Sequence, residues 1–123
     1  MESSRDVYLL FQQYLEDNNY EKFYILLVNK ANEPIGNPVP ISEGGIDGTV
    51  ADPKRILRPA LEKHASGLFL AHNHPSGNLK PSEADIRLTH KIRDAAKLLD
   101  INLIDHLIIG INGYYSFADE GRL

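Results

Sequence analysis

The spacing of apolar residues along the chain predicts three helices. Over residues 4–17, apolar side chains recur at three- and four-residue intervals, which is the pattern of an amphipathic helix. A second helix is predicted behind Asp52-Pro53, because Asp is a good N-cap and Pro is favoured at the first helical position. A third helix is predicted to start at Ser82 and to end at about residue 99. Its apolar stripe comprises Leu88, Ile92, Ala96 and Leu99.

The segments between these helices are rich in aromatic and branched side chains, and they predict five strands. Four are predicted at residues 20–28, 38–42, 67–72 and 102–109, and a fifth closes a hairpin around Ile111-Asn112-Gly113. Residues 67–72 are apolar on both faces, which indicates a central, buried strand. The order α, β, β, α, β, α, β, β predicts the α/β fold class, with helices packed on a mixed β-sheet.

Length and composition fit a single compact domain over residues 1–123. Apolar residues make up 42% of the chain, enough for a core, and no apolar run reaches the roughly 18 residues of a membrane span. The chain has no cysteine, and its N-terminus is acidic and amphipathic, unlike a signal peptide. We therefore expect a cytoplasmic protein without a membrane partner. A net charge of -4 argues against broad nucleic-acid binding, which needs a basic face.

Two histidines follow the predicted central strand directly. In an extended chain, residues two apart point to the same side, so His72 and His74 can aim at one point. Pro75 favours an extended conformation at His74 and helps to end the strand. Two imidazoles held in this way are a natural pair of zinc ligands.

Asp85 is the third polar residue of this region. It extends the apolar stripe of the third predicted helix by one turn toward the N-terminus, where an unpaired carboxylate costs free energy. The helix N-terminus offsets only about 0.3 to 1 kcal/mol of that cost, whereas a bound cation would offset far more. Two nitrogens and one oxygen leave a fourth tetrahedral position for water, which is the pattern of a catalytic zinc site.

The residues alone leave three interpretations of this stretch open. It is a metal site, a nuclease motif, or a solvated loop followed by an ordinary helix start in which Ser82 is the N-cap and Asp85 the N3 residue. The letters His-Asn-His do not define an HNH nuclease, whose named residues are dispersed through a ββα unit. A zinc deaminase is disfavoured because its Pro-Cys-x-x-Cys ligands are absent.

The stretch resembles the motif of a known enzyme family. The string from His72 to Asp85, HNHPSGNLKPSEAD, is similar to the JAMM (MPN-type) zinc metalloprotease motif H-x-H-P-x(n)-S-x-x-D. Together with the following helix and INLIDHLIIG, it closely resembles the bacterial RadC family. The resemblance runs from about Glu21 to Phe117 and therefore covers most of the chain.

This resemblance implies a JAB/MPN α/β domain, similar to cytidine deaminases, that hydrolyses peptide or isopeptide bonds. It implies that His72, His74 and Asp85 hold one Zn²⁺ per chain. It also implies that Ser82 donates a hydrogen bond to the oxyanion of a tetrahedral intermediate, and that Glu21 is the general base. The expected partner is a peptide or protein substrate whose identity the sequence does not give.

Glu21 is also a reasonable base from its position in the predicted strand. It shares one side of the strand with Phe23 and Ile25, so a carboxylate there could take a proton from water near the ligands. The alternative is a solvated charge at a strand end. Glu43, in the glycine-rich segment ISEGG, is a rival base, whereas Glu83 is expected to point away from the site.

Three other polar positions have structural and functional interpretations. Asn73 ties down the loop or is a surface amide. The second predicted helix carries Leu57, Ala60 and Leu61 on one apolar stripe. His64 falls on the same stripe, so we expect it to be packed and hydrogen-bonded. The pair Asp105-His106 interrupts an apolar strand, either to orient a ligand histidine or, as we prefer, as a satisfied core pair.

A DNA-repair or nuclease factor and a non-catalytic MPN scaffold are the competing functions. RadC relatives commonly carry an N-terminal helix-hairpin-helix region associated with DNA binding. Only about 20 residues precede Glu21, too few for that module, so we expect no such region and no nucleic-acid partner for this domain alone. The intact set of motif residues argues against a scaffold without a metal.

Overall fold

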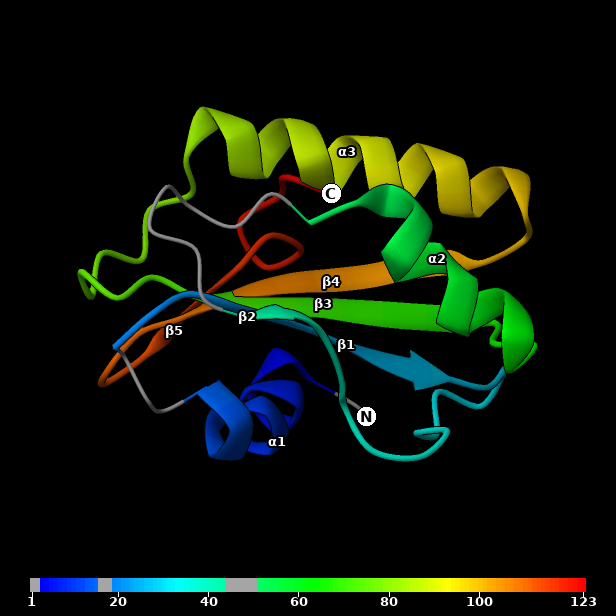
Figure 1. The fold of residues 1–123 in the computed structure, drawn as a ribbon, viewed down its shortest axis with the longest axis horizontal. Helices are drawn as coiled ribbons and strands as arrows, with labels where there is room; N and C mark the ends of the chain where they lie inside the picture. Colours follow the sequence, from blue (N-terminus) through cyan, green and yellow to red (C-terminus); the bar gives the residue numbers. More distant parts are fainter. Residues whose placement is uncertain (1–2, 16–18, 44–50) are drawn as a thin grey trace.

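The computed structural model describes residues 3–15, 19–43 and 51–123, and Figure 1 shows their arrangement. The helices and strands are α1 (Ser4–Leu15), β1 (Lys22–Val28), β2 (Val39–Glu43), α2 (Pro53–Glu62), β3 (Gly67–Asn73), α3 (Glu83–Leu98), β4 (Asn102–Ile109) and β5 (Tyr114–Ser116). Their order is the one predicted from the sequence, and each predicted element is present. None of the helices in the described part of the chain is long and apolar enough to cross a membrane.

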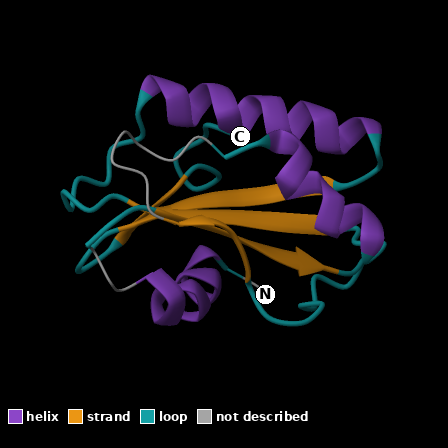
Figure 2. Cartoon of the chain, in the orientation of Figure 1, coloured by secondary structure: helices purple, strands orange, loops and turns teal. Residues whose placement is uncertain are grey.

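The five strands form one mixed sheet in the order β2-β1-β3-β4-β5. β3 and β4 are parallel, and the other neighbouring pairs are antiparallel. Helices α2 and α3 cover one face of the sheet and α1 lies against the other, as Figures 1 and 2 show. This arrangement confirms the predicted α/β domain with a mixed sheet. All residues of β3 are buried, as expected for a central strand covered on both faces.

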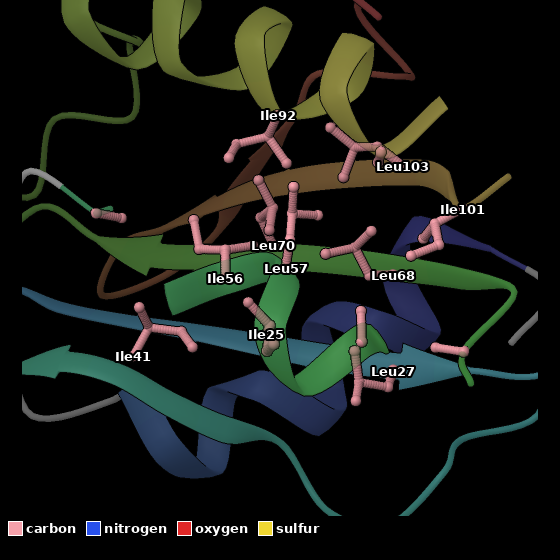
Figure 3. Close-up of a cluster of buried hydrophobic side chains, with 14 of the residues drawn as sticks. Ile25, Leu27, Ile41, Ile56, Leu57, Leu68, Leu70, Ile92, Ile101 and Leu103 are labelled. Atoms are coloured by element: carbon pink, nitrogen blue, oxygen red, sulfur yellow. The ribbon is translucent and has the colours of Figure 1, made fainter. Parts of the chain in front are cut away.

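Two apolar clusters hold the layers together, one on each face of the sheet. The cluster beneath α2 and α3 is drawn in Figure 3 and includes Ile25, Leu68, Leu70, Ile92 and Leu103. The cluster against α1 includes Phe11, Leu26, Phe69, Leu107 and Ile109. Each fully buried side chain of this size contributes about 1.5 to 3 kcal/mol, so these clusters are the main source of stability for the packed layers.

Strand β4 contains one extra residue relative to β3. Leu68 pairs with Leu103, but the next residue, Phe69, pairs with Asp105, so that Ile104 is bulged out of the register. A bulge of one residue reverses which face each later side chain occupies. His106 therefore lies on the α3 side of the sheet, where its ring contacts Phe117 at a centroid distance of 4.9 Å.

The connection from β3 through α3 to β4 brings two chain segments to the same end of the sheet. β3 ends at Asn73, and the loop that follows leads directly to the N-terminus of α3, as Figure 1 shows. In α/β sheets, the crevice beyond the carboxyl ends of parallel strands is the usual place for a functional site. Side chains at the end of β3 and in the first turn of α3 are thus placed next to each other.

The expectations for His64 and for two leucines at the helix ends are wrong. Helix α2 ends at Glu62, and His64 adopts a positive φ of 52° beyond it, with an exposed side chain. Leu61 is 49% exposed and Leu99 is 46% exposed, so neither belongs to the buried stripe of its helix. In each case the apolar spacing in the sequence continues beyond the last residue of the helix that packs against the sheet.

Candidate metal centre

The three predicted ligands converge at the end of β3. The Nε2 atoms of His72 and His74 lie 3.1 Å apart. Asp85 Oδ2 lies 3.2 Å from His74 Nε2, and Asp85 Oδ1 lies 3.4 Å from His72 Nε2. Ligands bound about 2.0 to 2.1 Å from a tetrahedral zinc lie about 3.3 to 3.4 Å from one another. The spacing of the donor atoms therefore fits a single small cation.

His74 is held by a backbone carbonyl group of the loop that follows β3. Its Nδ1 lies 2.7 Å from the carbonyl oxygen of Asn78. Because a carbonyl oxygen can only accept, Nδ1 carries the proton, and Nε2 of the neutral ring presents a lone pair to the site. A lone pair and a carboxylate oxygen facing each other at 3.2 Å need a cation between them, either a proton or a metal ion.

Asp85 is oriented by the capping box that starts α3. Ser82 Oγ accepts a hydrogen bond from the backbone N–H of Asp85 at 3.0 Å, and the backbone N–H of Ser82 donates to Asp85 Oδ2 at 2.9 Å. The helix-start interpretation and the ligand interpretation of these two residues are thus compatible. The cap fixes the carboxylate while its oxygens still face the two histidines.

The electrostatics of the site reflect this convergence. Burial raises the pKa of Asp85, but hydrogen bonds with His72 and His74 outweigh it, and the net pKa lies well below the usual range. The hydrogen bond with Asp85 raises the pKa of His74 against the opposing effect of burial, and the charge of Glu21 adds to the increase. Without a metal ion, the positive charge that the site favours is a proton on His74.

Glu21 lies immediately before β1, half-buried, on the side of the sheet that carries the ligands. Phe23 pairs with His72 across the antiparallel β1–β3 ladder, and their rings stack at 5.7 Å. Continuing that register by two residues places Glu21 opposite His74, on the same face. The influence of the Glu21 charge on the pKa of His74 agrees with this placement.

Asn73 is fully buried, so the surface-amide alternative is wrong. Its Oδ1 accepts a hydrogen bond from the backbone N–H of Lys22 at 2.7 Å, and its Nδ2 donates to the carbonyl oxygen of Tyr20 at 3.1 Å. The amide therefore holds the backbone on both sides of Glu21.

The remaining acidic candidates lie differently. The side chain of Glu43 is outside the described residues. Glu83 is exposed, and its carboxylate lies 4.0 Å from an Arg87 guanidinium nitrogen, which agrees with its expected outward position. Ser82 is exposed beside the ligands, and because its Oγ accepts the capping bond, its own O–H can donate to a bound substrate.

Two buried residues contact the candidate ligands. Thr89 is not among the residues that the sequence assigns to the site, and His106 belongs to the pair for which orienting a ligand histidine is the less favoured alternative. His106 Nε2 lies 2.8 Å from His72 Nδ1, and His106 Nδ1 lies 2.6 Å from Thr89 Oγ1. Burial of His106 lowers the pKa of its ring well below the ordinary value, so the ring is neutral. His106 is thus a satisfied core residue and the neighbour of a ligand at the same time. Thr89 follows Asp85 by one helical turn, a spacing that was visible in the sequence.

Comparison with known proteins identifies the family. The RadC-like JAB domain family matches residues 1–122 of the chain. A UPF0758 protein of Flavobacterium johnsoniae is 44% identical over 119 residues, which cover 97% of this chain and 52% of that protein. A UPF0758 protein of Porphyromonas gingivalis is 46% identical over 121 residues, 98% of this chain and 53% of that protein.

The chain therefore belongs to the RadC-like JAB domain family, as its motif predicted. It spans about half the length of the curated relatives it matches. The domain combines a mixed five-stranded sheet with a His-His-Asp group that could hold a metal ion.

Proposed function

We propose that this domain is a zinc-dependent hydrolase of peptide or isopeptide bonds. The observation that carries the proposal is the convergence of two imidazole nitrogens and one carboxylate at 3.1 to 3.4 Å. The donor set of two nitrogens and one oxygen suits zinc and leaves a coordination position open. Zinc bound by His72, His74 and Asp85 would supply Lewis acidity, which acidifies water and polarises a carbonyl group.

The protein's own residues supply proton transfer and charge stabilisation. Glu21, on the ligand face beside His74, would accept a proton from the attacking water and pass it to the leaving amine. Ser82 would donate its O–H to the oxygen of the substrate carbonyl, where negative charge develops. Each role requires a side chain near the ligands that can exchange a proton, and the positions of Glu21 and Ser82 support both.

The first test is metal content. The protein, purified without a polyhistidine tag, is expected to bind about one zinc per chain, and His74→Ala or Asp85→Ala is expected to remove it. His64→Ala is the matched control, because His64 is exposed and lies outside the site. Full zinc content in a His74→Ala, Asp85→Ala double variant would show that the site is wrongly assigned.

The second test concerns the reaction. Zinc-loaded protein is incubated with a library of peptides and Lys-linked isopeptides, and in parallel with single- and double-stranded DNA. We expect cleavage of an amide bond that Glu21→Gln abolishes without loss of zinc. Cleavage of DNA alone would replace the proposal with a nuclease. Zinc binding without any cleavage, together with unchanged zinc content in Glu21→Gln, would favour a non-catalytic domain.

A further inference from the structure

A chain of hydrogen bonds links the backbone of one candidate ligand to the ring of another. Thr89 Oγ1 lies 2.6 Å from the carbonyl oxygen of Asp85 and 2.6 Å from His106 Nδ1. His106 Nε2 in turn lies 2.8 Å from His72 Nδ1. All three linking side chains are buried, with Thr89 and His106 at 0% exposure and His72 at 6%. Water therefore does not compete for these contacts.

The direction of each hydrogen bond follows from the first one. A carbonyl oxygen has no proton, so Thr89 must donate its hydroxyl proton to Asp85. A hydroxyl group has only one proton, so Thr89 Oγ1 can only accept from His106. His106 Nδ1 is therefore protonated.

The other nitrogen of His106 is then an acceptor. The ring is buried between aromatic side chains, with Phe23 at a centroid distance of 5.6 Å and Phe117 at 4.9 Å, where a charged imidazolium would be poorly solvated. A neutral ring carries one proton, which is on Nδ1, so Nε2 accepts a hydrogen bond from His72 Nδ1. His72 consequently directs the lone pair of its Nε2 toward His74 and Asp85.

We propose that Thr89 and His106 are positioning residues that hold His72 in the tautomer able to bind a metal ion through Nε2. The inference rests on the metal site of the proposed function but not on its substrate or reaction. His74 reaches the same tautomer through the backbone carbonyl of Asn78, whereas His72 depends on two side chains from α3 and β4.

The bulge in β4 makes this arrangement possible. Leu103 lies in the cluster beneath α2 and α3, so a regular strand would have placed residue 106 on the opposite face with Ile104. The extra residue returns His106 to the α3 side, opposite Leu70 and next to His72. Bulges that redirect a side chain in this way are common beside functional sites.

The first experiment determines the tautomers directly. Long-range ¹H–¹⁵N spectra of the metal-free, ¹⁵N-labelled protein at about pH 8, above the ordinary pKa of imidazole, show which ring nitrogen carries the proton. We expect the Nδ1–H form for both His106 and His72. An Nε2–H form of His106 would overturn the proposal, because His106 could then no longer accept from His72.

The second experiment removes the hydroxyl group that sets the direction. Thr89→Val keeps the shape of the side chain but leaves His106 Nδ1 without an acceptor, so His106 can exchange its tautomer and donate to His72. We expect the zinc dissociation constant to rise by about 10- to 100-fold in Thr89→Val and to stay within about threefold of wild type in Thr89→Ser, which restores the hydroxyl. Cobalt(II) absorption provides a second measure of the ligand geometry.

The outcomes separate this proposal from the proposed function. Equal zinc affinity in Thr89→Val and Thr89→Ser would overturn the positioning of His72 by Thr89 and His106, while the metal site stands. Failure of the wild-type protein to bind zinc would overturn the metal site. The tautomer spectrum would still decide whether Thr89 and His106 set the tautomer of His72. If Thr89→Val does not fold by circular dichroism, the decision rests on that spectrum and on Thr89→Ser.

Discussion

The side chain of Asn73 fastens the backbone on both sides of Glu21. One amide group bonds to the N–H of the residue after Glu21 and to the carbonyl oxygen of the residue before it. Asn73 lies between the two ligand histidines in the sequence but points away from them, so it contributes no ligand. Its position connects the β3 end, where the metal would bind, to the proposed base.

Replacement of Asn73 should therefore affect proton transfer more than metal binding. In Asn73→Ala, we expect the zinc content to be unchanged and the rate of amide hydrolysis to fall by about 10- to 100-fold, because Glu21 loses its fixed position. Loss of two buried hydrogen bonds should also lower the free energy of unfolding by about 1 to 3 kcal/mol. Asn112→Ala removes an exposed amide and is the matched control. Wild-type turnover in the Asn73→Ala variant would show that the position of Glu21 does not depend on this amide.

Ser82 combines a structural and a proposed catalytic role, and measuring stability and turnover on the same variants separates them. Ser82→Ala removes both the N-cap oxygen and the hydroxyl donor, so we expect a loss of about 1 kcal/mol in the free energy of unfolding and a large loss of turnover. Ser82→Thr keeps both groups and should retain most of each property. Denaturant unfolding and turnover are measured on the same samples. Turnover that falls only in proportion to the folded fraction would assign Ser82 to the cap alone.

Zinc affinity should depend on pH through His74. The pKa of His74 is raised, chiefly by its hydrogen bond with Asp85, and the proton on Nε2 must leave before a metal ion binds. Affinity should therefore fall by about tenfold per pH unit below that raised pKa and level off above it. Asp85 remains ionised in this range, because its pKa is shifted downward. Competition titrations at a series of pH values test this, and a flat profile would contradict it.

The same raised pKa makes a prediction for the metal-free protein. A histidine whose folded pKa exceeds its unfolded value stabilises the fold below the unfolded pKa of about 6.5, and this contribution is lost as pH rises through the folded pKa. Zinc replaces the proton, so the zinc-loaded protein should lack this decrease. The measurement is chemical unfolding of both forms across this window, and parallel curves would exclude His74 as the group responsible.

Asp105 should limit stability at neutral pH. Burial raises the pKa of its carboxyl group, although Ser116 and the backbone N–H groups of Ala118 and His106 donate hydrogen bonds to it. Its contribution is therefore present below the unfolded pKa and is lost as pH rises through the folded pKa. Asp105→Asn retains an acceptor for both N–H groups and does not titrate. We expect its free energy of unfolding, relative to wild type, to increase as pH rises through the raised folded pKa, by about 1.4 kcal/mol per unit of pKa difference. A constant difference would disprove this.

The elements of the fold could be predicted because each follows from a local pattern. The convergence of the candidate ligands could be predicted for the same reason, since His72 and His74 follow from alternation along a strand and Asp85 from the stripe and cap of a helix. The contact between His106 and His72 is only an alternative at the level of the sequence, because the bulge at Ile104 decides which face His106 occupies and leaves no mark on the apolar pattern. The end of α2 at Glu62 also lacks a clear sequence signal, which is why the expectation for His64 is wrong.

The three candidate ligands lie close together in the sequence, whereas the side chains that support His72 come from α3 and β4. An unfolded chain keeps the His-x-His pair from His72 to His74, so zinc that binds the proposed site would also bind the denatured state. The increase in melting temperature on adding zinc then reports the difference between two affinities, not the affinity of the folded site. That difference is the share of zinc binding contributed by tertiary structure, so calorimetry with zinc would measure how much the surrounding sheet adds to a short peptide motif.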